Sequence, residues 1–160
     1  MITMADATPG DVDAIVALYA ELDEFYGAGE DSGEGAAGAH DAPVERAQRV
    51  RSALFGDPPA GRALLAWDGA VLAGFAGYQF IWPSSALTTS LYLKELYVTS
   101  AYRRAGVGRL LMDRLRAIAV AGGCTRLEWT TDTSNGRAQS FYKSLGAEPL
   151  ETKVFYRVTL

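Results

Sequence analysis

The segment AYRRAGVGRLLMDRL, residues 101–115, has two glycines and three of its four arginines within residues 103–109. Arg103, Arg104 and Arg109 surround Gly106 and Gly108, directly before apolar residues with helical spacing. Like charges repel, and each glycine costs a helix about 1 kcal/mol relative to alanine, so this composition needs a compensating partner. A helix start presents backbone N–H groups and a positive helix end, and glycine lets an anion approach them closely. The segment is therefore predicted to bind an anion, with the arginines adding charge-assisted hydrogen bonds.

Two common phosphate-binding motifs do not fit this segment. A P-loop has four residues between its glycines and then Gly-Lys-Ser/Thr, whereas GVGRLL has neither the lysine nor the hydroxyl. A dinucleotide-binding fingerprint needs a third glycine or alanine where this chain has Leu111. A helix start with solvated arginines remains the alternative to an anion site at this point.

The elements that would position this segment are expected to alternate in the second half of the chain. Residue patterns predict strands over 1–5, 64–67, 71–81, 89–99, 124–131 and 153–160. Helical spacing predicts helices over 12–26, 44–55 and 134–147, and another from Val107 to the Gly122-Gly123 pair. The apolar stretch 63–82 is interpreted as a hairpin and not as a membrane span, because Asp68-Gly69 is a strong turn signal inside it. This order predicts an α/β layer arrangement.

Composition limits the class of protein. A chain of 160 residues with 49% hydrophobic content is expected to form one domain over residues 1–160. Its net charge of −4 argues against nucleic-acid binding. No secretory signal and a single cysteine, Cys124, lead us to expect a cytoplasmic protein without a disulfide. His40 is the single histidine and has no cluster of other ligands in the sequence, so no metal site is predicted.

The segment Arg103–Gly108, R-R-A-G-V-G, resembles the Q/R-x-x-G-x-G/A pyrophosphate loop of the GNAT superfamily of acyl-CoA N-acyltransferases. LYLKELYVTSAYRRAGVGRLLMDRL resembles the strand, loop and helix of that family's acyl-CoA motif, and EWTTDTSNGRAQSFYKSLGA resembles the strand and helix that follow it. This resemblance covers residues 91–147 in order. It implies an α/β fold, also described as an α+β sandwich, with a mixed, mostly antiparallel sheet flanked by helices. The anion would then be the pyrophosphate of acetyl-CoA, used as a cosubstrate without a metal.

The resemblance also implies roles for individual residues. Tyr142 matches the tyrosine that protonates the departing CoA thiolate; the alternative is a core aromatic beside Phe141. Glu95 would help to deprotonate the amine, and its alternative is a surface ion pair. Asn135 would bind the cofactor or cap a helix. The implied cofactor-binding residues are Leu96, Tyr97, Val98, Arg103, Arg104, Ala105, Gly106, Val107, Gly108, Arg109, Asn135 and Tyr142.

The expected reaction is acetyl transfer to a primary amine of a small molecule by direct attack. The alternatives are a protein or peptide N-acetyltransferase and a non-catalytic CoA-binding regulatory domain of the same fold. Within the family, the chain is most similar to the diamine (spermidine/spermine) acetyltransferase branch, but that branch usually has two successive acids where this chain has Lys94-Glu95. We therefore assign no polyamine specificity, and a homodimer is a further expectation.

Charge is unevenly distributed along the sequence. Residues 1–60 contain 12 acidic and 3 basic residues, whereas residues 61–160 contain 7 acidic and 12 basic residues. The acidic part is predicted to attract a cationic amine. The acids expected to do so are Glu21, Asp23, Glu24, Glu30, Asp31 and Glu34.

Overall fold

The computed structural model describes residues 1–27 and 42–159, with the side chains of 25–27 left aside, and divides the chain into two compact units, Met1–Trp129 and Thr130–Leu160. The first unit contains the strands β1 (Ile2–Asp6), β2 (Arg62–Asp68), β3 (Val71–Ile81), β4 (Thr89–Val98) and β5 (Cys124–Trp129). Its α-helices are α1 (Val12–Gly27), α2 (Pro43–Phe55) and α3 (Val107–Ala121), and its short 3-10 helices are η1 (Pro9–Asp11), η2 (Ser85–Leu87) and η3 (Ser100–Tyr102). The second unit contains α4 (Gly136–Ser144).

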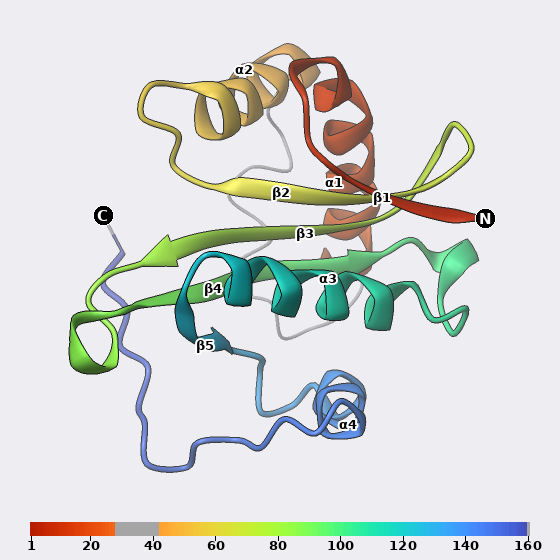
Figure 1. Ribbon diagram of the computed structural model, residues 1–160. Coiled ribbons are helices and arrows are strands. Elements are labelled where there is room, and N and C mark those ends of the chain that lie inside the picture. The colour runs from red at the N-terminus through yellow and green to blue at the C-terminus, as the bar shows by residue number, and fades with distance from the viewer. Residues whose placement is uncertain (28–41, 160) are drawn as a thin grey trace. The chain divides into compact units, whose positions relative to one another are not determined.

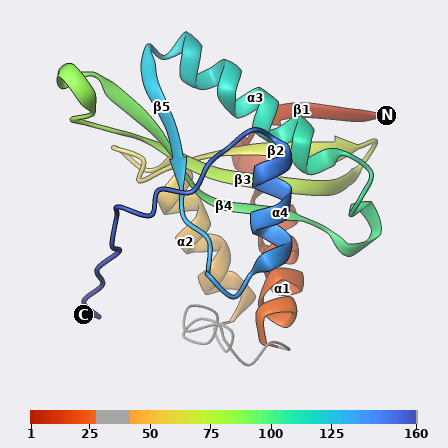
Figure 2. The same cartoon turned by 90° about the horizontal axis from the view of Figure 1, so that it is seen from below.

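The sheet of the first unit is mixed and mostly antiparallel. Its five strands follow the chain order β1-β2-β3-β4-β5, and only β5 runs parallel to its neighbour β4. Helices α1 and α2 cover one face of the sheet and α3 covers the other (Figures 1 and 2). This arrangement confirms the predicted fold class, and β2 and β3 meet at the turn expected after Asp68, where Gly69 has a φ of +59°.

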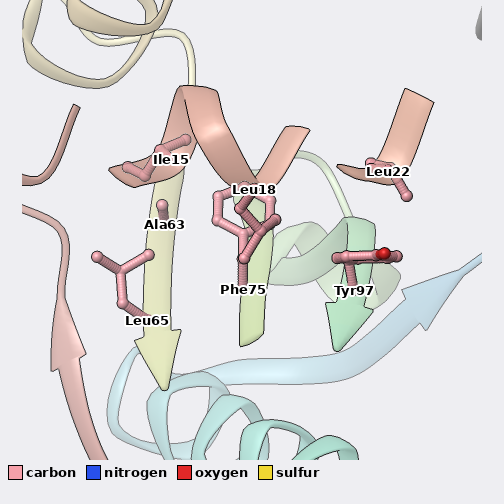
Figure 3. Packing of buried hydrophobic residues seen from close by; sticks show 7 residues of the cluster. All are labelled: Ile15, Leu18, Leu22, Ala63, Leu65, Phe75 and Tyr97. Atoms are coloured by element: carbon pink, nitrogen blue, oxygen red, sulfur yellow. The ribbon is translucent and has the colours of Figure 1, made fainter. Parts of the chain in front are cut away.

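The core under α1 joins the helix to three strands. Its buried residues are Ile15, Leu18, Leu22, Ala63, Leu65, Phe75 and Tyr97. The first three repeat at helical spacing and point from α1 toward the sheet, and Leu18 lies over Phe75 (Figure 3). At the start of this helical segment, the Thr8 hydroxyl and the Thr8 N–H both donate to the Asp11 carboxylate at 2.7 Å, and the Asp11 N–H donates to the Thr8 carbonyl at 2.9 Å. The predicted helix and its apolar face are thus confirmed.

The opposite face of the sheet packs against α3. Val107, Leu111, Met112, Leu115 and Ala119 are buried along that helix. The helical spacing predicts Val107, Leu111 and Leu115 on this face, whereas Leu110, which it also includes, is 45% exposed. The helix ends at Gly122, and Gly123 follows with a φ of +68°. The core therefore fixes the position of α3. The helix begins at Val107, after the loop of residues 99–106 that follows the end of β4.

A β-bulge in β4 changes which side chains face which helix. Tyr78 pairs with Leu93 but Gly77 pairs with Glu95, so Lys94 is an extra residue on β4. Before the bulge, Leu91 lies opposite Phe80, whose ring lies against Gly122 at the end of α3.

After the bulge, Tyr97 lies opposite Phe75, and both belong to the core under α1. Opposite residues share a face of the sheet. The odd-numbered residues before Lys94 and those after it therefore point to different faces, and Glu95 shares the α1 face with Tyr97.

The second unit confirms one predicted element and contradicts another. The helix expected over 134–147 is present as α4. The strand expected over 153–160 is wrong, because residues 153–159 form no strand. Val154, Phe155, Tyr156 and Val158 are 63–87% exposed. Aromatic and β-branched residues favour extended backbone, but a strand also needs a partner for its hydrogen bonds.

Candidate active site

The predicted anion-binding segment forms the start of α3. Gly106 is the N-cap residue, and its φ of +83° is one that glycine adopts without strain. The first N–H groups of the helix, from Val107 on, have no carbonyl acceptor within the helix. The Leu110 N–H is the first that has one, and it donates to the Gly106 carbonyl at 3.1 Å. Arg104 and Arg109 are exposed on either side. The geometry is that of a helix N-terminus with cations beside it, which suits a phosphate group.

The last part of β4 extends beyond its pairing with β5. That pairing ends at Leu93 and Trp129, whereas β4 continues to Val98. The Thr99 N–H donates to the Ala73 carbonyl of β3 at 3.0 Å, and main-chain groups point to alternate sides along a strand. The main-chain groups of Leu96 and Val98 consequently point away from β3, on the side where the pairing with β5 has ended. An extended ligand with amide groups can pair with the strand there.

Glu95 lies on the α1 face of this same part of β4 and is half-buried. Its cross-strand neighbour Gly77 has no side chain, and a Cβ built there would lie 3.9 Å from the Glu95 Cβ. Phe75 packs edge-on against Tyr19 of α1, with ring centroids 5.3 Å apart. The carboxylate thus lies on a face that carries aromatic side chains, separated by the sheet from the face that α3 covers.

The Arg103 side chain contacts the end of β4. Its Nε donates to the Val98 carbonyl at 3.2 Å, and its Nη2 donates to the Tyr97 hydroxyl at 3.3 Å. The guanidinium also lies over the Tyr97 ring, 5.6 Å from its centroid. The structure therefore brings Arg103 together with Tyr97 and Val98, while its contact with a phosphate stays a prediction.

The Tyr97 hydroxyl connects this arginine to α1. It donates to Glu21 Oε1 at 3.0 Å, and the Ser100 N–H donates to the same oxygen at 2.8 Å. The Ser100 hydrogen bond is the main reason that the pKa of Glu21 lies below its ordinary value, against an opposing effect of burial. Burial raises the pKa of Tyr97, and its hydrogen bond to the Glu21 carboxylate raises it further.

The remaining predicted site residues belong to the second unit. Asn135 is the N-cap of α4, and its side-chain oxygen accepts from the Ala138 N–H at 3.0 Å. Tyr142 lies in the last part of α4, half-buried, with its ring centroid 5.2 Å from that of Phe141. The structure thus shows the capping role that the sequence left open for Asn135. The roles of both residues toward a cofactor stay predictions.

A family model described as the acetyltransferase (GNAT) family matches residues 16–147. The chain belongs to this family.

The chain spans less than two thirds of the length of the first curated relatives it matches. The chain is 29% identical over 111 residues to a Bos taurus thialysine N-epsilon-acetyltransferase, covering 64% of this chain and 65% of the relative. It is 32% identical over 89 residues to L-ornithine N5-acetyltransferase NATA1 of Arabidopsis thaliana, covering 56% and 39%. The solved integron cassette protein VCH_CASS6 from the mobile metagenome of V. cholerae has a TM-score of 0.85 at 27% identity, covering 99% of this chain and 92% of that one.

The acidic residues that are predicted to attract a cationic amine differ from one another in their contacts. Glu21 accepts hydrogen bonds from the loop, and Asp23 forms an ion pair with Arg46 of α2 at 2.7 Å. Glu24 is exposed on α1. The other predicted acids, Glu30, Asp31 and Glu34, lie outside the described residues, as does His40.

Sequence reasoning missed the contact that joins α1 to the loop. Glu21 and Ser100 are 79 residues apart, and nothing in the local pattern of either segment indicates their pairing. The excess of acids drew attention to Glu21, but for a role toward solvent. Glu21 lies three residues after Leu18 and directly before Leu22, so helical spacing puts it at the border of the apolar face of α1. This spacing is the signal that could have suggested an internal partner.

Three further findings concern the described residues. Burial raises the pKa of the Cys124 thiol, which keeps it protonated and weakly nucleophilic at neutral pH. Over residues 1–27 and 42–159, no group of three or more His, Cys, Asp or Glu side chains is arranged to hold a metal ion. In the same ranges, no helix combines the length and the apolar composition needed to cross a membrane.

Proposed function

We propose that this chain is an acetyl-CoA-dependent N-acetyltransferase that acts on a primary amine of a small molecule by direct attack. The observation that carries the proposal is the end of β4 in the first unit. There, the strand has main-chain groups beyond its pairing with β5 and a half-buried carboxylate, Glu95. The loop that follows the strand leads to the N-terminus of α3. The family match and the relatives that act on thialysine and ornithine support the same reaction.

The residues of the first unit fit the parts of acetyl-CoA. The start of α3 from Gly106 to Arg109 would hold the pyrophosphate, with Arg104 adding charge. The main chain of Leu96 and Val98 would pair with the pantetheine amides. When bound, the cofactor supplies an acetyl group as a reactive thioester.

The chain's own groups would then move protons and polarise the carbonyl. The Val98 N–H would donate to the thioester carbonyl oxygen, which gains negative charge during attack. Glu95, on the α1 face of β4, would accept the amine proton directly or through water. Tyr142 would donate a proton to the departing thiolate, and Asn135 would orient the cofactor while capping α4.

Several expectations about the whole protein accompany this proposal. We propose that the two units act as one domain, since the family match runs through both of them. A cytoplasmic location is proposed from the single cysteine, and a homodimer is a separate proposal. The acceptor is proposed to be cationic, because acids outnumber bases in residues 1–60 and Glu24 is exposed on α1.

An amine panel tests the proposed function. The purified chain is incubated with acetyl-CoA and with lysine analogues, ornithine, polyamines, an aminoglycoside and a peptide, and the released thiol is followed. Turnover with a small primary amine supports the proposal. Turnover with the peptide alone would favour a protein or peptide acetyltransferase, and CoA binding without any turnover would favour a regulatory domain.

Glu95→Gln provides the matched variant for the same assay. Without the carboxylate, the amine must lose its proton to solvent, so kcat/KM falls most at neutral pH and partly recovers at alkaline pH. A variant with the wild-type pH profile would remove Glu95 from the mechanism.

A further inference from the structure

Four residues from three parts of the first unit form one connected group, which we call the α1–loop cluster: Glu21, Tyr97, Ser100 and Arg103. Its hydrogen bonds run from the Glu21 carboxylate to the Ser100 N–H and the Tyr97 hydroxyl, and from that hydroxyl to the Arg103 guanidinium, all between 2.8 and 3.3 Å. Arg103 also donates to the Val98 carbonyl. The cluster therefore joins α1, the end of β4 and the loop that leads to α3.

The charges within the cluster compensate one another. Arg103 brings a positive charge to one side of the Tyr97 hydroxyl and Glu21 brings a negative charge to the other. Tyr97 itself is 5% exposed, so its hydroxyl needs a partner in the folded protein. Charged partners make such hydrogen bonds shorter and stronger than neutral ones.

A second contact holds the same loop from the other side. The Tyr102 hydroxyl donates to Asp68 at the end of β2, at 3.2 Å. The Thr99 N–H donates to Ala73 of β3. The segment from Thr99 to Arg103 is thus attached to α1, β2, β3 and β4 before the chain enters the Gly106 turn.

We propose that Glu21 is a positioning residue for the CoA-binding loop and that Arg103 acts with it by holding the end of β4. This inference rests on the proposed function. Glu21 touches no reacting atom; it fixes Ser100 and, through Tyr97, Arg103. The Val98 carbonyl is held by Arg103, which orients the peptide groups at the point where the thioester would bind. Pre-organising the loop in this way lowers the entropic cost of cofactor binding.

Glu21→Leu, Glu21→Gln and Asp23→Leu, each in the full chain, test the proposal. Leucine removes both acceptor bonds at similar size, whereas glutamine keeps an oxygen for the Ser100 N–H and the Tyr97 hydroxyl. Asp23→Leu is the matched control, because it removes a carboxylate and an ion pair from the same helix without touching the loop. The readouts are CoA affinity by calorimetry, KM and kcat for acetyl-CoA, and hydrogen exchange of residues 99–106.

Glu21→Leu is expected to weaken CoA binding and to raise the KM for acetyl-CoA about tenfold. A tenfold change corresponds to about 1.4 kcal/mol. This free energy lies within the cost of leaving a buried hydrogen-bonding group without its partner. Hydrogen exchange of the loop speeds up, kcat at saturation changes little, and Glu21→Gln recovers most of the affinity. Asp23→Leu leaves CoA affinity unchanged.

Three results would overturn the proposal. If the loop exchanges faster in Glu21→Leu but CoA affinity stays the same, the cluster supports the fold only. If Asp23→Leu weakens CoA binding equally, the effect belongs to α1 as a whole. If the wild-type chain binds no CoA, the proposed function fails and the positioning role fails with it, which distinguishes this case from the other two.

Discussion

Replacing Gly74 by alanine tests whether the start of α3 must pack this closely on the sheet. A Cβ built on Gly74 would lie 3.0 Å from the Tyr97 carbonyl oxygen and 3.2 Å from both Leu111 Cδ1 and Val107 Cγ1. The first of these atoms belongs to the β4 backbone, and the other two belong to buried side chains of α3. None of them is the end of a flexible surface chain, so the added methyl group must displace either the strand or the helix.

The expected loss of stability can be worked out from these contacts. Overpacking a core typically costs about 1–3 kcal/mol. Alanine in place of glycine recovers about 0.4–1 kcal/mol by restricting the unfolded chain. With the middle of each range, about 2 kcal/mol lost and about 0.7 kcal/mol recovered, the net destabilisation is about 1.3 kcal/mol. This lowers the Tm of a chain of this size by about 3–5 °C.

Thermal and urea unfolding of Gly74→Ala measure this loss, with Gly61→Ala as the control. A Cβ on Gly61 would meet only the Tyr78 carbonyl oxygen, at an ordinary 3.5 Å, so that variant is expected to be at least as stable as the wild type. Because the displaced part of α3 contains the proposed pyrophosphate site, Gly74→Ala should also bind CoA more weakly. A Gly74→Ala variant as stable as Gly61→Ala would refute the reasoning.

Four more outcomes are expected. Gly108→Val should abolish most CoA binding in calorimetry while the circular dichroism spectrum stays native, because the side chain would crowd the helix start; unchanged affinity would remove the loop from the cofactor site. Tyr142→Phe should lower kcat by about 10²–10⁴ with unchanged CoA affinity, and wild-type turnover would mean that another group protonates the thiolate. The KM for a cationic amine should rise with salt, since screening weakens its attraction to the acids of residues 1–60, whereas a salt-independent KM would argue against that attraction. Because the folded pKa of Glu21 is depressed, its contribution to stability is complete above the unfolded pKa of about 4.3 and is lost as the pH falls through the folded value; acid titrations of Tm should show a smaller loss for Glu21→Gln than for the wild type.

Local patterns predicted most of the fold because the relevant forces act over short stretches of sequence. The spacing of Ile15, Leu18 and Leu22 identified the buried face of α1, and the Asp68-Gly69 pair identified the hairpin. The strand expected over 153–160 was wrong for a reason of the same kind. Its residues have high strand propensity, but propensity alone does not supply a neighbouring strand.

The candidate site was predicted less completely, because its parts are joined by contacts between distant segments. The resemblance identified the loop from Arg103 to Arg109 and the strand before it. It did not indicate that the Arg103 side chain lies against Tyr97, or that Tyr97 reaches Glu21 across 76 residues. Such hydrogen bonds depend on how α1 lies on the sheet, which no single stretch of sequence encodes.

The bulge at Lys94 explains why one strand serves both the core and the site. In a regular strand, Glu95 would share a face with Leu93 and Leu91, which are 2% and 0% exposed, and an unpaired carboxylate among them would be costly. The extra residue turns Glu95 to the face of α1, and the pairing with β5 also ends at Leu93. Before this point the strand is therefore paired on both sides and buries its leucines, whereas after it the strand presents a carboxylate on one face and main-chain groups at one edge. An alternating pattern read from the sequence assigns these residues to the wrong faces, because a bulge leaves every residue identity unchanged and alters only the register.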